Sequence, residues 1–395
     1  MNSIPDNLIS DIADSWMADI IDRLAALHIE VPSWGFGRGG TRFGSYPTGD
    51  EPTTPEGKIL AAGKFHDLTG QGGTVALHFP WDGKNKRDVR GLKKHLKKAG
   101  IRAGSINANL FDVRDRGPLD ASIRFGSLTH PDEKIRKASI DHCIDCIDYM
   151  RILDSDTFVL WLPDGSNSPG QMSMYDQADR LDEAVTTIAS HLEKDETMLI
   201  EYKLFEPGFY STAIQDYGRS LYLSWLGGEN VKVLVDLGHH AHGVNVEQII
   251  AQTIRQGKMG GFHFNDSFYA DDDLATGSLH PHQMFRIFIN LIEGELRGYT
   301  PVQDIAFMID QSHNVKDPFE ELIESVENIE TAYARALLVD FEELMACQDA
   351  CDPIAADRVL MAAFNSDVQP LKLASRELKG LPHDPMNEWR QSGGY

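Results

Sequence analysis

The chain has 395 residues, of which 42% are hydrophobic and 25% are charged, a balance that is ordinary for a globular protein and excludes a disordered chain. Its 60 acidic and 37 basic residues give a formal net charge of -23. With no long run of lysine and arginine, this charge argues against nucleic acid and anionic membranes as partners. The N-terminus has no secretory pattern and no apolar run is long enough to cross a membrane, so we expect a cytoplasmic protein.

Short segments rich in β-branched residues alternate along the chain with longer amphipathic segments, which is the pattern of βα units. We predict eight strands, at 29–36, 74–80, 101–108, 157–163, 197–203, 231–238, 260–266 and 305–311. Helical periodicity is clear between them, for example at 86–100, 132–153, 177–194, 246–256 and 319–338. The alternation predicts an α/β fold, a closed (β/α)8 TIM barrel. The competing open sheet of the dinucleotide-binding type lacks its GxGxxG motif.

Three parts of the chain lie outside this repeat. We predict an N-terminal helix over 1–28, the (β/α)8 catalytic domain over 29–337, and a C-terminal helical extension and tail over 338–395. The Gly-, Thr- and Pro-rich stretch 37–60 reads as a long loop. Its Gly-rich part has no P-loop ending, so a lid or a subunit-contact loop with Phe43 at its tip is expected. The last residues, 383–395, read as a poorly ordered end.

Polar residues end four of the predicted strands. They are Glu201, Asp236, His263 and Asp310. In a (β/α)8 barrel the carboxyl ends of all strands open on one face, so these side chains should meet there. Three buried carboxylates and an imidazole that stay unpaired raise one another's pKa, and a divalent cation removes the conflict. The oxygen-rich set without a thiolate suits Mn²⁺, Mg²⁺ or Co²⁺ better than a structural Zn²⁺. For any one residue alone, a helix cap or an ion pair is the competing interpretation.

A second cluster follows in the loops after the sixth and seventh strands. His239 lies three positions after Asp236, and Asp271 and Asp273 are alternate members of an acidic triplet. These three side chains are candidates for a second cation. A solvated acidic loop is the other interpretation of the spacing. Two cations beside each other suit substrates with adjacent hydroxyl and carbonyl groups, such as sugars.

Further candidates lie on the same predicted face. Flat rings pack well against the C–H face of a sugar, and Trp34, Trp81 and Trp161 are candidates for this role. His78 is a candidate for proton transfer in ring opening, and Lys203 for polarising a substrate oxygen. A place in the hydrophobic core is the alternative for each aromatic residue, and a structural role for each polar one.

Four cysteines are too few for a disulfide scaffold, and a reducing compartment fits best. Cys143 and Cys146 form a CxxC, but Ile144, Ile147 and Met150 recur around them at helical spacing. We expect two structural helix residues rather than a metal or redox site.

Several blocks of the chain resemble one known family. VPSWGFGRGGTRF, VALHFPWD, LWLPDGSNSPGQ, EYKLFEPGFYST, LVDLGHHAHG, GGFHFNDSFYADDDL and MIDQSHNVKDP closely resemble, in the same order, the bacterial L-rhamnose isomerase family, particularly its broad-specificity branch. The resemblance runs from about 31 to 340. It implies a xylose-isomerase-like barrel, usually a homotetramer, that uses Mn²⁺.

The resemblance also implies roles for individual residues. The positions matching Glu201, Asp236, His263 and Asp310 hold the structural metal in that family, and those matching His239, Asp271 and Asp273 hold the catalytic metal. Trp34, His78, Trp161 and Lys203 match residues of the sugar pocket, and Phe43 matches a residue contributed by a neighbouring subunit. Phe268 replaces a lysine of the family's NDSKY, and the 37–60 loop and the C-terminal tail also differ, which leaves substrate preference and subunit contacts open.

Together these features predict a metal-dependent aldose-ketose isomerase acting on L-rhamnose or a related aldose. We expect two divalent ions, Mn²⁺ or alternatively Mg²⁺, Co²⁺ or Zn²⁺, and a catalytic group of His78, Lys203 and Asp310. The alternatives are a ketose 3-epimerase on the same barrel and a metal-binding sugar receptor without turnover. The complete set of seven predicted ligands argues against both.

Overall fold

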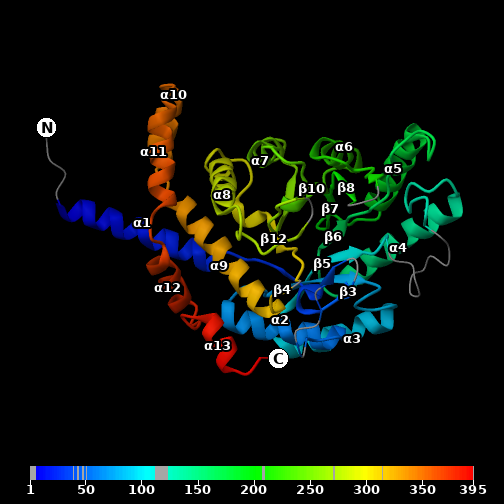
Figure 1. Ribbon diagram of the computed structural model, residues 1–395, viewed down its shortest axis with the longest axis horizontal. Coiled ribbons are helices and arrows are strands. Elements are labelled where there is room, and N and C mark those ends of the chain that lie inside the picture. The colour runs from blue at the N-terminus through cyan, green and yellow to red at the C-terminus, as the bar shows by residue number, and fades with distance from the viewer. Residues whose placement is uncertain are drawn as a thin grey trace.

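The computed structural model describes residues 6–38, 40–41, 44–46, 49, 51–111, 123–206, 210–269, 272–313 and 315–394. Phe43 and Asp271, both candidates for the site, lie outside these residues. Figure 1 shows a ring of parallel strands surrounded by helices, with a helical extension at one side.

The barrel consists of eight parallel strands, which confirms the predicted architecture. In barrel order they are β1 (Val31–Pro32), β4 (Thr74–Phe79), β5 (Arg102–Ala108), β6 (Thr157–Leu160), β7 (Thr197–Glu201), β10 (Val231–Asp236), β11 (Met259–Phe264) and β12 (Ala306–Ile309). A parallel bridge between Glu30 and Met308 joins the last strand to the first and closes the ring. Each strand lies within, or one residue beyond, a predicted segment.

Helices cover the outside of the barrel. They are α2 (Pro55–Thr69), α3 (Lys86–Ala99), α4 (Glu133–Ile152), α5 (Met174–Ala189), α6 (Tyr217–Gly227), α7 (Val246–Arg255), α8 (Pro281–Leu296) and α9 (Pro318–Leu337). Most begin at a residue whose side chain accepts a hydrogen bond from the first turn, such as Asn85, Asp216 and Asp317. Such caps satisfy N–H groups that the helix itself leaves unpaired. Cys143 and Cys146 are fully buried on α4, and burial raises the pKa of both thiols, as expected of core residues.

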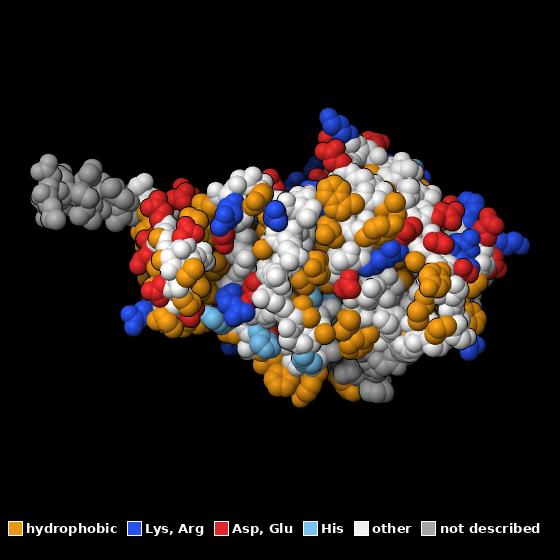
Figure 2. Space-filling model, turned by 90° about the horizontal axis from the view of Figure 1, so that it is seen from above, with side chains coloured by type: hydrophobic (Ala, Val, Ile, Leu, Met, Phe, Trp, Pro, Cys, Tyr) orange, Lys and Arg blue, Asp and Glu red, His pale blue; other side chains and the backbone are white. Residues whose placement is uncertain are grey.

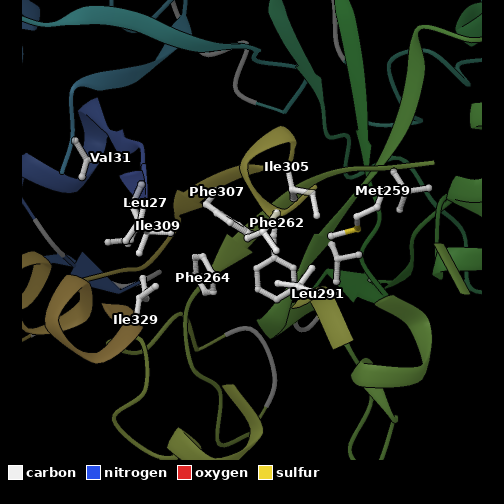
Figure 3. Close-up of a cluster of buried hydrophobic side chains, with 14 of the residues drawn as sticks. Leu27, Val31, Met259, Phe262, Phe264, Leu291, Ile305, Phe307, Ile309 and Ile329 are labelled. Carbon is white, nitrogen blue, oxygen red and sulfur yellow. The ribbon is translucent and has the colours of Figure 1, made fainter. Parts of the chain in front are cut away.

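Alternation along each strand separates the core from the barrel interior. In β11, Phe262 and Phe264 point outward and pack with Phe307 and Ile309 of β12 against Leu291 of α8, as Figure 3 shows. The residues between them point inward. Val159, Leu199 and Leu234 form a small apolar cluster inside the barrel, and the next inward position of each of their strands, toward the carboxyl end, is Trp161, Glu201 and Asp236. The two-residue alternation that directs apolar side chains into the core thus also places these candidate residues in one layer of the barrel interior.

Three local predictions were wrong. Ser33–Phe36, predicted as strand, is a 3-10 helix. The predicted loop 37–60 ends early, because Thr54 caps α2 and Pro55 occupies its first turn. Short antiparallel pairs that were not predicted lie above the barrel: β2 (Gly40–Thr41) with β3 (Gly44–Ser45), and β8 (Phe205–Glu206) with β9 (Tyr210–Ser211).

The chain begins with α1 (Asp6–Ala26) and ends with four helices, α10 (Phe341–Asp349), α11 (Pro353–Phe364), α12 (Gln369–Leu378) and α13 (Pro385–Gln391). In Figure 1, α10 and α11 stand beside the barrel, and α12 and α13 return along α1 and α9. The expected disorder of 383–395 is wrong over α13, because Trp389 stacks on Phe319 with ring centroids 3.6 Å apart. Arg390 also pairs with Glu320 at 2.6 Å.

Replacing this ring tests how firmly the last helix is attached. We expect Trp389→Leu, which keeps an apolar side chain but loses the stacking, to lower the free energy of unfolding by about 1 kcal/mol and to speed proteolytic removal of α13. Thermal unfolding and limited proteolysis measure both effects. Trp16→Leu is the control, since Trp16 is 46% exposed. Equal protease resistance of wild type and Trp389→Leu would contradict the assigned contact.

Within the described residues, no helix is long and apolar enough to cross a membrane. Figure 2 shows acidic and basic side chains interspersed with apolar ones over the face that it presents.

Candidate active site

Four predicted strand-end residues meet inside the carboxyl end of the barrel. One ligand atom from each of Glu201, Asp236, His263 and Asp310 lies within 4.8 Å of the others. His263 Nδ1 is central: it lies 3.3 Å from Glu201 Oε1, 3.4 Å from Asp236 Oδ2 and 3.5 Å from Asp310 Oδ2. These separations are close to those of neighbouring ligands held roughly 2.1 Å from a shared ion. The donor set therefore fits a divalent cation.

In Asp236 and Asp310, one carboxylate oxygen accepts hydrogen bonds from the protein and the other faces His263. Asp236 Oδ1 accepts from Gly238 N at 2.8 Å and from Asn265 Nδ2 at 2.9 Å, which leaves Oδ2 toward His263. Asp310 Oδ1 accepts from Trp34 Nε1 at 3.0 Å, which leaves its Oδ2 toward the same nitrogen. Metal ligands are commonly oriented by such outer contacts.

The charges of this cluster are not balanced by the protein alone. Burial and the neighbouring carboxylates raise the pKa of Asp310 to about 6, although the charge on His263 opposes the shift. Burial disfavours the charged form of His263, but Glu201, Asp236 and Asp310 outweigh it and raise its pKa well above the usual value. Asp236 is also buried, yet the charges of His239 and His263 hold its pKa below its usual range. A single imidazole thus faces three carboxylates, and a bound cation would balance their negative charges.

His239 lies beside the cluster on the 3-10 turn Leu237–His239. Its Nδ1 donates to the carbonyl oxygen of Tyr202 at 2.9 Å, which makes Nε2 the lone-pair nitrogen of the neutral ring. That Nε2 lies 3.9 Å from Asp236 Oδ1. The arrangement places an imidazole lone pair next to the four-residue cluster.

Aromatic rings form a wall at the same end of the barrel. Trp34 and His78 meet edge to face with centroids 5.6 Å apart, and His78 stacks on Trp81 at 4.2 Å. Phe111 continues the wall between Trp81, at 5.7 Å, and Trp161, at 5.0 Å. Such a wall offers apolar faces beside a polar cluster, as recognition of a sugar requires.

Several buried polar atoms at this end have no hydrogen-bond partner among the described residues. They are His78 Nδ1, Trp161 Nε1, His263 Nδ1 and Asn265 Oδ1. Buried polar atoms in folded proteins are nearly always hydrogen-bonded, and exceptions that gather in one place point to a polar ligand.

His78 and Lys203, the two predicted catalytic groups besides Asp310, both lie at this wall. Burial lowers the pKa of His78 to about 3, so its imidazole is neutral near pH 7 and has one donor and one acceptor nitrogen. The Nζ of Lys203 donates to Glu206 at 2.9 Å and lies 5.2 Å from the centroid of Trp161. The wall thus carries one neutral imidazole and one cation.

The acidic loop after β11 is described only in part. Asp266 is fixed by hydrogen bonds from the N–H groups of Leu279 and His280, and Asp272 accepts from the N–H groups of Phe268 and Tyr269. Asp272 therefore holds the loop together. Asp273 adopts a left-handed backbone, with φ of 45°, and is not a member of the four-residue cluster.

Two residues of the site were missed in the sequence. Phe111 follows β5 in the way that Trp34, Trp81 and Trp161 follow their strands, so the rule that selected those residues also applied to it. Asp82 is buried and accepts from Ser33 Oγ at 2.7 Å and His78 N at 2.9 Å. It ties the turns after β1 and β4 together. Four residues after His78 and next to Trp81, it carried no distinguishing signal.

The support that Trp34 gives to Asp310 can be tested. Trp34→Phe keeps an aromatic ring but removes the N–H, and we expect divalent-metal affinity to fall roughly 10- to 100-fold. Calorimetric titration of stripped protein with Mn²⁺ measures the change. Trp81→Phe keeps the ring next to His78 and should leave the affinity unchanged. Equal losses in both variants would show that the effect is not specific to the Asp310 contact.

Comparisons with known proteins agree with this geometry. Residues 68–301 match the family model described as a xylose isomerase-like TIM barrel. The chain is 40% identical over 366 residues to a probable sugar isomerase of Mesorhizobium japonicum, covering 92% of this chain and 84% of the relative. It is 38% identical over 374 residues to a probable sugar isomerase of Rhizobium meliloti, covering 94% and 85%.

Solved structures share the fold. A xylose isomerase domain protein from Alicyclobacillus acidocaldarius matches with a TM-score of 0.53 and 16% identity, over 78% of this chain and 99% of that one. A 3-keto-D-glucoside 4-epimerase from E. coli matches with a TM-score of 0.51 and 12% identity, over the same 78% and 99%. The family model and the two relatives together show that the chain belongs to the xylose isomerase-like TIM barrel family.

Proposed function

We propose that the protein is a metal-dependent sugar isomerase that converts an aldose to its ketose. The observation that carries the proposal is the cluster of buried Glu201, Asp236 and His263 with partly buried Asp310, whose ligand atoms lie within 4.8 Å of one another. The two relatives named as probable sugar isomerases support the same activity.

The residues suggest how the work is divided. The four-residue cluster would hold a divalent ion, which as a Lewis acid polarises adjacent hydroxyl and carbonyl oxygens of a sugar. Trp34 and Trp161 would cover the apolar face of the substrate and exclude water. His78, neutral near pH 7, would accept a hydrogen bond from a sugar hydroxyl, and Lys203 would donate one to a substrate oxygen. Asp310, held at Oδ1 by Trp34, would contribute to catalysis by keeping its Oδ2 on the ion that binds the substrate.

A second cation, held by His239, Asp271 and Asp273, is part of the proposal. It is supported by the hydrogen bond from His239 Nδ1 to Tyr202 O, which leaves Nε2 as the possible ligand atom. We propose Mn²⁺ for both positions. L-rhamnose or a closely related aldose is the proposed substrate, and Phe43 from a neighbouring subunit of a homotetramer would complete the pocket. These finer points rest on the resemblance of the sequence blocks.

We also propose that 29–337 is the catalytic unit and that 338–395 is an appended helical extension.

Product analysis tests the proposed reaction. The Mn²⁺-loaded protein is incubated with a panel of aldoses that includes L-rhamnose, L-mannose, L-lyxose and D-allose, and products are identified by ¹³C NMR. We expect a ketose with the carbonyl at C2. Epimerised ketoses formed from a parallel panel of ketoses, with aldoses untouched, would replace the proposal by a sugar epimerase. Tight sugar binding without any product would replace it by a receptor.

A further inference from the structure

A partly buried carboxylate lies inside the barrel below the proposed metal cluster. Glu30 belongs to the closing bridge between β1 and β12: its N–H donates to Phe307 O and its carbonyl accepts from Ile309 N. Ile29 and Val31 on either side point outward into the hydrophobic core. The alternation therefore directs Glu30 into the barrel interior, where a branched apolar side chain is usual.

The protein holds this carboxylate in a fixed place. Both oxygens accept from Ser105 N, at 3.0 and 3.1 Å, and Oε1 also accepts from Ser105 Oγ. The adjacent Gly104 leaves the room: a Cβ there would lie 1.5 Å from Glu30 Oε2. Burial raises the pKa of Glu30, while its hydrogen bonds with Ser105 and the charge on His263 act against the shift. The space left by a glycine and three hydrogen-bond contacts from Ser105 hold this partly buried acid in a defined position.

A cavity joins Glu30 to the metal cluster. It has a volume of about 500 Å³ and opens at the amino end of the barrel, where Thr74, Arg102, Thr157 and Lys232 line it. Glu30 and Ser105 line its interior, and His263 lines it as well. A space of this size with polar walls holds several water molecules, since one water occupies roughly 30 Å³.

The geometry of His263 gives the cavity a role. Its Nδ1 is buried and faces Glu201, Asp236 and Asp310. Nδ1 binds a cation only through its lone pair, so the ring proton must lie on Nε2. Because the Nδ1 edge is turned to the carboxylates, the Nε2 edge is the one that meets the cavity. Metal-binding histidines usually donate this second N–H to a carboxylate, directly or through water.

We propose that Glu30 is a positioning residue for His263. Through water in the cavity beneath the metal cluster, Glu30 accepts the hydrogen bond of the His263 Nε2–H group and so keeps Nδ1 available as a ligand. The inference rests on the proposed metal site but not on the identity of the reaction. It assigns a function to the amino-terminal side of the barrel interior, away from the sugar pocket.

Glu30→Gln is the test, with two measurements that need no turnover. We expect the affinity of stripped protein for Mn²⁺ to fall roughly 10- to 100-fold. In protein loaded with diamagnetic Mg²⁺ and labelled with ¹⁵N-histidine, where Nδ1 is the proposed ligand, the ring shifts of the His263 Nε2–H group should move toward those of a weaker hydrogen bond. Ser105→Ala, which removes the hydroxyl that donates to Glu30 but keeps the backbone N–H, should give a smaller change in the same direction.

Glu330→Gln is the matched control, because Glu330 is a buried glutamate that contacts Gln71 and lies outside the site. It should leave both readouts unchanged. Unaltered metal affinity and unaltered His263 shifts in a folded Glu30→Gln protein would overturn the assignment. The proposed reaction would be unaffected by that result, and a failure of the aldose assay would leave these two readouts valid.

Discussion

Asp236→Asn is expected to abolish both metal binding and aldose turnover, with turnover falling by a factor on the order of 10³ or more, since loss of a bound Lewis acid removes several kcal/mol of transition-state stabilisation. The amide is isosteric, and its oxygen still accepts from Gly238 N. Its NH₂ group, however, replaces the oxygen that lies 3.4 Å from His263 Nδ1. A donor then stands where a ligand is needed.

Metal content after dialysis against Mn²⁺ and the initial rate of ketose formation measure this effect. Asp216→Asn is the control: Asp216 caps α6, and asparagine caps helices as well as aspartate does. An Asp236→Asn protein that keeps its metal and works within tenfold of wild type would show that the cluster is not the catalytic centre.

Phe264→Ala should produce the largest loss of stability, about 3 to 5 kcal/mol. Phe264 is fully buried, and its ring lies 4.8 Å from Phe262, 5.5 Å from Phe307 and 5.9 Å from Phe288. The substitution leaves a cavity between β11, β12 and α8, next to His263 in the chain. Figure 3 shows Phe264 with Phe262 and Phe307.

Urea unfolding of stripped protein measures the loss without a contribution from bound metal. Phe268→Ala changes the same residue type four positions later, where the ring is 54% exposed, and should change the free energy of unfolding by no more than about 0.5 kcal/mol. A loss below about 1 kcal/mol for Phe264→Ala would mean that the site can collapse around the smaller residue.

The barrel and its four-residue cluster could be predicted from the sequence because both depend on short periods. Alternation in β7, β10 and β11 sends hydrophobic residues outward and the residues between them inward, and the barrel rule then turns distant strand ends into neighbours. This rule predicts that Glu201, Asp236, His263 and Asp310 lie close together. It also applied to Phe111, which was overlooked although it follows its strand in the same manner.

Other features depend on contacts that no local pattern announces. Trp389 lies in a polar, Pro- and Gly-containing tail that reads as disordered. The stacking of Trp389 on Phe319 and the ion pair of Arg390 with Glu320 hold α13 in place. In Asp310, Oδ1 accepts a hydrogen bond and Oδ2 faces His263 because the indole N–H of Trp34, 276 positions away in the chain, donates to Oδ1. Glu30 could be assigned to the interior by alternation, but its hydrogen bonds to Ser105 and the close approach of Gly104 belong to the folded barrel.

The central claim is that the four-residue cluster holds a cation required for conversion of an aldose to a ketose. The most direct measurement is the rate of ketose formation by EDTA-stripped protein as Mn²⁺ is added back, with bound metal counted at each step. We predict no turnover in stripped protein and recovery in proportion to bound Mn²⁺. Full turnover by protein with far less than one bound metal ion per chain, or none at full occupancy on any aldose, would contradict it.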